Sequence, residues 1–265
     1  MDGMEGLKDG GQNNASPYSR ADLYDLLFQH YAADLPFYLD AARAAGGPVL
    51  DIACGTGRVL FAALDAGIDV DGIDLSPEML ERLQANARAR GVEARVQLAD
   101  MRRFHMPRRY ACVMIPFNAF AHNLTAEDQV AALSCCYSHL VSGGRLVFDV
   151  FSATVDMLAD PVSEPVLELE TKHPETGQEL RLYDGRRLDF VTQTQHSRIE
   201  IQEMAPDGGV ARSHRFVTLV RWVWPSEMDL LLRLAGFTRI EISGGFDGRP
   251  VAEHRGSIVV SAWRA

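Results

Sequence analysis

The sequence predicts an α/β fold in which a doubly wound, mostly parallel sheet carries an antiparallel β insert. Through about the first 150 residues, apolar stretches with the period of a strand alternate with stretches that have the period of a helix. Such alternation is typical of a parallel sheet with helices on both faces. From residue 162 to about 224 the apolar period changes to two, which indicates antiparallel strands.

Five strands of the parallel sheet are expected where short apolar runs lie between helical stretches. Their ranges are 48–53, 69–74, 94–98, 110–115 and 144–150. The first residues of two helices support this assignment: Ser76 is a typical N-cap followed by Pro77, and Thr125 precedes Asp128 by three residues, as in a capping box. Ligands of such sheets bind beyond the carboxyl ends of the strands.

The expected insert consists of four stretches with alternating polarity. They read "VLELETKH", "QELRLYD", "FVTQTQHSRIEIQEM" and "SHRFVTLVRWVW". The last of them is expected to place Phe216, Trp222 and Trp224 on one face and Arg215 and Arg221 on the other. After the insert, "PSEMDLLLRLAGF" has a helical period, and "TRIEI" and "SIVVSAWRA" supply the last two strands of the main sheet.

The chain therefore divides into four expected segments. Residues 1–16 form a disordered tail, because they are rich in Gly, Asn and acidic residues. Residues 17–151 form the core with an N-terminal helical lid, residues 152–224 form the β insert, and residues 225–265 return to the core. The insert follows the fifth strand of the sheet.

The composition argues against several classes of protein. Lys and Arg number 26 against 36 Asp and Glu, and the formal net charge of -10 disfavours a nucleic-acid partner. No run approaches the roughly 18 to 20 apolar residues of a membrane span. The N-terminal stretch has no basic region followed by an apolar one, so we expect no secretory signal there. The pairs Arg102–Arg103, Arg108–Arg109 and Arg186–Arg187 are expected on the solvated surface.

The four cysteines are expected to be reduced thiols. They are Cys54, Cys112, Cys135 and Cys136, and they do not have the spacing of a zinc site. We therefore expect no bound metal and a cytoplasmic location.

The stretch "VLDIACGTGR" (49–58) places a Gly-x-Gly turn between the first strand and the first helix. Gly55 and Gly57 allow the backbone to turn sharply and to approach a ligand closely. A dinucleotide site would need a third small residue three positions after Gly57, so that the helix packs closely on the strand. Leu60 occupies that position, which disfavours NAD.

Five motifs together resemble those of the class I S-adenosylmethionine-dependent methyltransferases. They are "LDIACGTGR", "GIDLSPEML" (72–80), "LADMRRF" (98–104), "PFNAFAH" (116–122) and "HLVSGGRLVFDVF" (139–151), in the order and spacing of that family. The resemblance implies a mostly parallel sheet of seven strands and a bound S-adenosyl-L-methionine, with S-adenosyl-L-homocysteine as the product. Ser142 stands where the family commonly has proline.

The resemblance also implies roles for individual residues. Asp51 would fix the turn and the amino-acid end of the cofactor, and the Ala53 carbonyl would accept from the cofactor's ammonium. Asp74 would bind the ribose hydroxyl groups, Asp100 would lie near the adenine amino group, and Met101 would contact the face of the ring. The matching motifs also place these residues at the cofactor: Cys54, Gly55, Thr56, Gly57, Leu75, Met79, Arg102, Pro116 and Asn118.

Three of these residues also fit purely structural roles. Asp51 could satisfy buried amide groups, Asp74 could cap a helix, and the helical position of Met79 is that of a core residue.

A smaller group within the family resembles this chain more closely, namely the amino-sugar N,N-dimethyltransferases and relatives of glycine N-methyltransferase. An aromatic-rich helical region (23–43) before the first strand and the β insert carry this resemblance. It implies that Tyr24 and Tyr31 contact the cofactor or the acceptor, although aromatic residues at helical spacing also serve packing. It further implies that the insert covers the acceptor pocket and contributes to a homodimer.

The expected reaction is methyl transfer to the amine or hydroxyl group of a small molecule, and secondary metabolism is one setting for it. His122 is the candidate general base, because the resemblance places it beside the methyl group and imidazole titrates near neutrality. Its alternative role is that of a packing residue at a helix end. His196, His214 and Tyr183 are weaker candidates. Two other functions stay open: a non-catalytic module that binds S-adenosylmethionine, and an NAD-dependent oxidoreductase.

Overall fold

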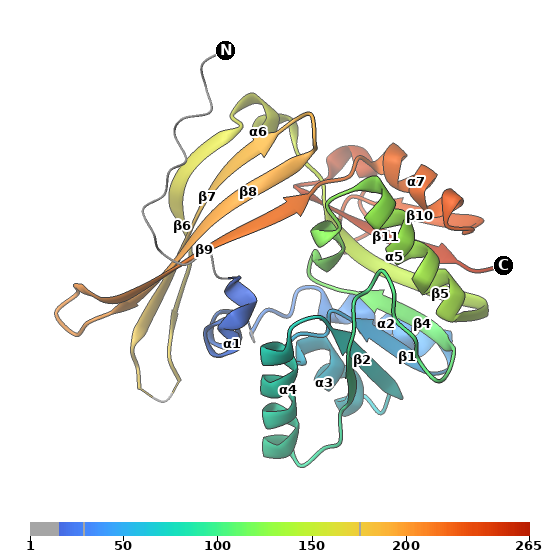
Figure 1. Ribbon diagram of the computed structural model, residues 1–265, viewed down its shortest axis with the longest axis horizontal. Helices are drawn as coiled ribbons and strands as arrows, with labels where there is room; N and C mark the ends of the chain where they lie inside the picture. The colour runs from blue at the N-terminus through green and yellow to red at the C-terminus, as the bar shows by residue number, and fades with distance from the viewer. Residues whose placement is uncertain (1–15, 29, 175) are drawn as a thin grey trace.

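The computed structural model describes residues 16–28, 30–174 and 176–265 and contains two sheets (Figure 1). The larger sheet has seven strands in the order β10-β11-β5-β4-β1-β2-β3, and the smaller sheet has four, in the order β6-β7-β8-β9. This arrangement confirms the predicted α/β fold with an antiparallel insert after the fifth strand. The expected tail lies almost entirely outside the described residues.

The strands of the larger sheet are parallel except for β11, which runs antiparallel to both β5 and β10. Their bounds are β1 Val49–Ile52, β2 Val70–Asp74, β3 Arg95–Leu98, β4 Tyr110–Ile115, β5 Leu140–Phe151, β10 Arg239–Ser243 and β11 Ser257–Trp263. Strand β5 begins four residues before the expected 144, because Leu140 pairs with Tyr110 ahead of an irregularity in the register. Gly143, with a φ of 75°, lies within this irregular segment.

Helices cover both faces of this sheet (Figure 1). Their bounds are η1 Pro17–Ser19, α1 Ala21–Phe28, α2 Leu35–Ala45, α3 Arg58–Asp65, α4 Pro77–Arg90, η2 Ala119–His122, α5 Ala126–His139, α6 Val155–Ala159, α7 Pro225–Leu234 and η3 Val251–Glu253. Helices α5 and α7 bury one face, and α2, α3 and α4 bury the other. No helix among the described residues is long and apolar enough to cross a membrane.

The expected helix caps are present. The Ser76 hydroxyl accepts a hydrogen bond from the Met79 amide at 3.2 Å, and the Thr125 hydroxyl accepts from the Asp128 amide at 3.1 Å. The aromatic-rich region forms two helices, α1 and α2, instead of one. Pro36 lies in the first turn of α2, where a proline is tolerated because the first amides of a helix have no partner within it.

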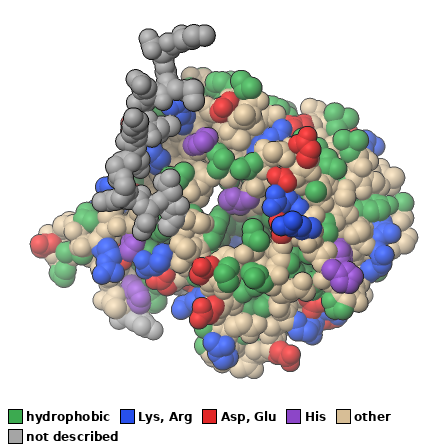
Figure 2. Space-filling view, viewed as in Figure 1, with side chains coloured by type: hydrophobic (Ala, Val, Ile, Leu, Met, Phe, Trp, Pro, Cys, Tyr) green, Lys and Arg blue, Asp and Glu red, His purple; other side chains and the backbone are tan. Residues whose placement is uncertain are grey.

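The insert sheet consists of β6 Val162–Lys172, β7 Glu179–Asp189, β8 Thr194–Met204 and β9 Val210–Arg221. Leu180, Leu182, Asp184, Arg186 and Leu188 of β7, together with the residues paired to them, define what we call the inner face. Helix α1 packs against one end of this face. The inner face is turned toward the core, and the molecular surface is hollowed between the two sheets (Figure 2).

Arg221 ends the insert and joins it to the core. Strand β9 stops at this residue, so Trp222 and Trp224, which were expected within the strand, follow it, and Trp222 is buried. The Arg221 guanidinium is also buried, and it donates to Gln129 of α5 at 2.5 Å and to Glu227 of α7 at 2.7 Å. These bonds fix the end of the insert against two helices of the core.

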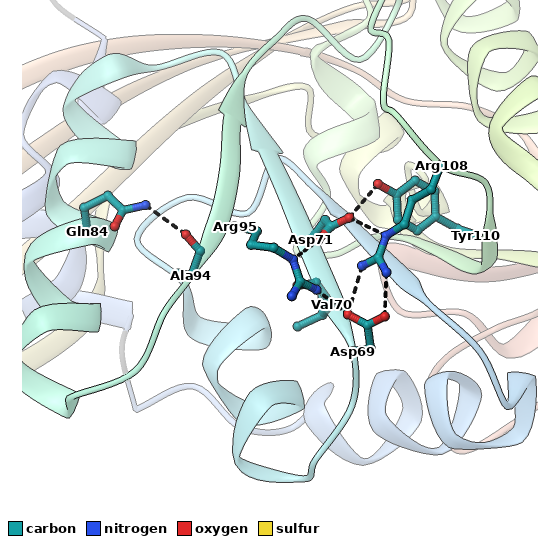
Figure 3. Close-up of polar contacts among 8 residues, drawn as sticks. All are labelled: Asp69, Val70, Asp71, Gln84, Ala94, Arg95, Arg108 and Tyr110. Carbon is teal, nitrogen blue, oxygen red and sulfur yellow. Dashed lines mark hydrogen bonds and ion pairs between the residues drawn. The ribbon is translucent and has the colours of Figure 1, made fainter.

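Near the N-terminal end of β2, two arginines bind neighbouring aspartates (Figure 3). The carboxylate of the buried Asp71 accepts from Arg95 at 2.7 Å, and from Arg108 and Tyr110 at 2.8 Å each. Arg108 also pairs with Asp69 and holds the pKa of that carboxyl at about 2. Arg108 is therefore part of an ion-pair network rather than a freely solvated side chain, which the sequence did not predict.

Candidate functional site

The candidate site begins at the turn between β1 and α3. Ala53, Gly55 and Gly57 all have positive φ angles, of 56°, 56° and 100°. At Gly57 a Cβ atom would lie 2.3 Å from the Phe61 ring, so only glycine fits there. Ala53 adopts the left-handed conformation although it has a side chain, which costs about 1 kcal/mol. Cys54 and Thr56 are buried within the same turn.

Asp51 lies at the end of β1 with 1 % of its surface exposed. Neither of its carboxylate oxygens has a hydrogen-bond partner of good geometry among the described residues. Burial raises the pKa of this carboxyl to about 8. A buried carboxyl in this state can receive a cationic or hydrogen-bond-donating group of a ligand. The backbone of Leu60 favours the charged form of this carboxyl, and burial outweighs that effect.

Asp74 at the end of β2 lies directly beside the turn. Its carboxylate accepts hydrogen bonds from the backbone amides of Gly55 and Ser76, both at 2.8 Å. Helix α4 is capped by Ser76 rather than by Asp74. Leu75, the next residue, keeps 65 % of its surface exposed, while Met79 is fully buried and belongs to the interior, as its helical position indicates.

The third candidate group consists of Asp100, Met101 and Arg102, which follow β3. Arg102 binds Asp100 through both Nε and Nη2, with a shortest distance of 2.6 Å, and reaches Asp128 of α5 at 2.9 Å. These bonds hold the pKa of Asp100 below its usual range. Met101 packs against the core. Arg102 thus has a defined partner that fixes the loop, unlike the freely solvated arginine that its position in an Arg–Arg pair suggested.

Asp149, which the sequence analysis did not select, shapes the end of β4. Its buried carboxylate accepts from the amides of Phe117 and Asn118 at 2.8 and 2.9 Å and from the Tyr38 hydroxyl. Both amides belong to residues in the left-handed conformation, with φ angles of 59° and 58°. Asp149 therefore stabilises the unusual backbone that follows Pro116.

The N-terminal aromatic residues cover the turn. Tyr24 and Phe117 line a cavity of about 30 Å³ together with Asp51, Ala53 and Arg58, which is space for about one water molecule. The Arg58 guanidinium lies 5.2 Å from the ring centres of both Tyr31 and Phe117. The predicted contact residues Tyr24 and Tyr31 are thus brought to the same place as the turn.

Arg58 itself is held by a buried ion pair. Its two terminal nitrogens donate to the two carboxylate oxygens of Asp34 at 2.6 Å each. Asp34 is fully buried immediately before α2. The pair therefore fixes the lid segment that precedes α2 to the first residue of α3.

His122 lies between the core and the insert. Its Nε2 atom is 2.7 Å from the Tyr18 hydroxyl, and its ring also bonds to the backbone of Leu219 in β9. The side chain keeps access to solvent, while the surrounding protein lowers the pKa of the imidazole. His196 is exposed on the outer face of the insert, and His214 pairs with Glu203 at 2.7 Å.

Tyr18, Asp34 and Asp149 take part in this site although the sequence did not single them out. Tyr18 is 104 positions from His122, so no local pattern could connect the two. Arg58 and Asp149, in contrast, lie within quoted motifs, and their charged side chains beside apolar strands were a usable signal.

Comparisons with known proteins agree with this geometry. Residues 49–144 match the family model described as "Methyltransferase domain". A dTDP-3-amino-3,4,6-trideoxy-alpha-D-glucopyranose N,N-dimethyltransferase from Streptomyces venezuelae is 32% identical over 241 residues, which covers 86% of this chain and 94% of that protein. A glycine/sarcosine N-methyltransferase from Aphanothece halophytica is 33% identical over 43% of this chain and 44% of its own.

Solved structures share the fold. An S-adenosylmethionine-bound amino pentose methyltransferase from Micromonospora echinaspora has a TM-score of 0.68 at 22% identity, covering 97% of this chain and all of its own. A sugar N-methyltransferase from Streptoalloteichus has a TM-score of 0.70 at 20% identity, covering 100% and 99% of the two chains.

The strained turn gives a first prediction. Replacing Ala53 with Gly should raise the free energy of unfolding by about 1 kcal/mol, because glycine adopts positive φ without the steric cost of a side chain. Ala89→Gly, in the exposed part of helix α4, should lower it by about 0.5 to 1 kcal/mol. Urea unfolding of both variants measures the two changes. If Ala53→Gly destabilises as Ala89→Gly does, the turn is not strained in solution.

Proposed function

Because the chain belongs to the S-adenosylmethionine-dependent methyltransferases, we propose that it methylates the amino group of a nucleotide-linked amino sugar. The observation that carries this proposal is the similarity over nearly the whole length of the chain, insert included, to an enzyme with such a substrate. The position of His122 between the core and the insert supports it, since an acceptor under the insert would lie beside this imidazole.

The residues at the turn fit the cofactor. Its ammonium group would pair with the unpartnered Asp51 carboxylate, and the Ala53 carbonyl would accept a hydrogen bond from it. Asp74 would bind the ribose hydroxyl groups, because a carboxylate can accept two hydroxyl protons. The exposed Leu75 and the Asp100–Met101 pair would contact adenine. When bound, the cofactor supplies a methyl group on a positively charged sulfur.

The protein's own contribution is alignment, exclusion of water and proton transfer. An amine attacks only when it is deprotonated, and a neutral imidazole can take its proton. The low pKa of His122 keeps it neutral at physiological pH. Nε2 of His122 accepts from the Tyr18 hydroxyl at 2.7 Å, and the other ring nitrogen is bonded to the Leu219 backbone. The amine proton would therefore reach the imidazole through Tyr18, whose oxygen takes it as its own proton moves to Nε2, so we assign His122 as general base and Tyr18 as its proton relay.

We also propose a cytoplasmic homodimer. The outermost insert strand, β6, exposes Val162, Val166 and Leu167, each with about half of its surface accessible. An edge strand with exposed apolar residues favours pairing with another copy. All four cysteines are free thiols, which fits a reducing compartment. Light scattering on the purified protein tests the dimer.

The substrate assignment is tested by incubating the protein with S-adenosylmethionine and a dTDP-linked 3-amino sugar. Mass spectrometry should show the addition of a first and then a second methyl group to the sugar. The corresponding 3-hydroxy sugar is the control, and it should stay unmodified. Methylation of the hydroxy sugar in preference to the amino sugar would contradict the proposed direction toward nitrogen.

The role of His122 predicts a selective loss of turnover. His122→Ala should lower kcat roughly 100-fold or more, as expected for loss of a general base, and should leave the Kd of S-adenosylmethionine unchanged. In the wild type, kcat at saturating cofactor and acceptor should fall as the pH is lowered through the pKa of the imidazole, which lies below its ordinary value, because protonation removes the base. His196→Ala, on the outer face of the insert, is the matched control. Wild-type turnover in His122→Ala would exclude the imidazole from the mechanism.

The burial of Asp51 predicts proton release on cofactor binding. With a pKa of about 8, this carboxyl is mostly protonated at pH 7, and the cofactor's ammonium group favours its charged form. Calorimetric titration at pH 7 should therefore give heats that vary with the ionisation enthalpy of the buffer. In Asp51→Asn this variation should vanish and affinity should fall. Heats independent of the buffer in the wild type would place the ammonium group elsewhere.

A further inference from the structure

The inner face of the insert sheet has a polar middle between two apolar ends. At one end Leu180 and Leu182 pack against helix α1. At the other end Leu188 packs with Trp222 in a separate apolar cluster. Between these ends, the same face of β7 carries Asp184 and Arg186.

Two residues of β8 extend this polar middle. Ser197 pairs with Arg186 across the two strands, and Gln195 pairs with Leu188. The Ser197 hydroxyl lies 3.4 Å from a carboxylate oxygen of Asp184, and the Gln195 amide donates to that hydroxyl at 2.9 Å. We call Asp184, Arg186, Gln195 and Ser197 the roof cluster.

Three atoms of the roof cluster are buried without a hydrogen-bond partner among the described residues. They are Oδ1 of Asp184, Nε of Arg186 and Oε1 of Gln195. Burial raises the pKa of Asp184 to about 6, because a buried carboxylate loses hydration. Buried polar atoms are normally satisfied, so three unpartnered atoms on one patch indicate a ligand that satisfies them.

The roof cluster faces the part of the core that holds His122. Val220 of β9 pairs with Gln195 and therefore lies on the same face. Val220 packs against the core cluster that includes Phe120 and Ala121, the two residues before His122. The inner face therefore lies on the side of the insert that contacts η2, the short helix that ends at His122.

We propose that the roof cluster binds the ring hydroxyl groups of the acceptor sugar, an inference that rests on the proposed function. A hydroxyl group both donates and accepts hydrogen bonds, and the roof cluster offers a carboxylate and an amide oxygen as acceptors and a guanidinium as donor. Its one carboxylate and one guanidinium balance in charge. A diphosphate would be repelled by the carboxylate of Asp184, so the cluster suits the sugar ring and not the nucleotide.

The neighbouring arginines Arg186 and Arg187 provide a matched test. Arg186 is half-buried on the inner face, while Arg187 is exposed and points to the other side of the sheet. Arg186→Met should weaken binding of a dTDP-linked 3-amino sugar about 10-fold or more, as expected for loss of hydrogen bonds from a charged donor. Arg187→Met should leave it unchanged. Both affinities are measured by calorimetry with S-adenosylhomocysteine bound, and its own Kd should be the same in both variants.

Gln195→Met is a second variant, in case Arg186→Met lowers the melting temperature and does not fold. It should also weaken sugar binding without changing the Kd of S-adenosylhomocysteine. Wild-type sugar affinity in folded Arg186→Met and Gln195→Met would overturn the inference, as would an equal loss in Arg187→Met. If a sugar binds in a way that depends on Arg186 but is not methylated, the roof site is supported and only the proposed function is contradicted. A wild type that binds no amino sugar would contradict both.

Discussion

The arrangement of the site depends on one buried guanidinium, that of Arg221. It ends the last strand of the insert and is bonded to one residue on each of two core helices, Gln129 and Glu227. A buried charge that loses a partner costs several kcal/mol, so the insert is held in the geometry that keeps these bonds. The bond between the His122 ring and the Leu219 backbone, two residues before Arg221, depends on the same geometry.

Three aspartates at the carboxyl ends of strands have different roles in the site. The carboxylate oxygens of Asp74 and Asp149 accept hydrogen bonds from backbone amides. Asp74 thereby stabilises the turn after β1, and Asp149 stabilises the left-handed residues after β4. Neither carboxylate oxygen of Asp51 has a hydrogen-bond partner of good geometry among the described residues. Asp74 and Asp149 therefore stabilise the backbone around the pocket, while Asp51 is left with the greater capacity to bind a ligand, although all three lie at one edge of the sheet.

The sequence predicted what local patterns determine. Apolar runs and the Ser76 and Thr125 caps located the elements, and the motif at the first turn located the candidate site. The contacts of Tyr18 and Asp34 were not predictable, because each joins distant segments without a local pattern. The prediction that Arg186 lies on the solvated surface failed for a different reason. Neighbouring residues of a strand point to opposite faces, so an Arg–Arg pair on a strand places one guanidinium inside whenever one face is covered.

Helix α1 links the two halves of the proposed site. Leu23 and Leu27 pack on the insert, while Asp25, on the other side of the helix, accepts hydrogen bonds from Arg82 and Asn86 of α4. The cavity beneath Tyr24 and Phe117 is about 30 Å³, far below the several hundred Å³ of a typical ligand pocket, so a ligand of that size requires the lining residues to change position. Tyr24 belongs to α1, and a displacement of this helix would also shift Leu23 and Leu27 against the inner face of the insert.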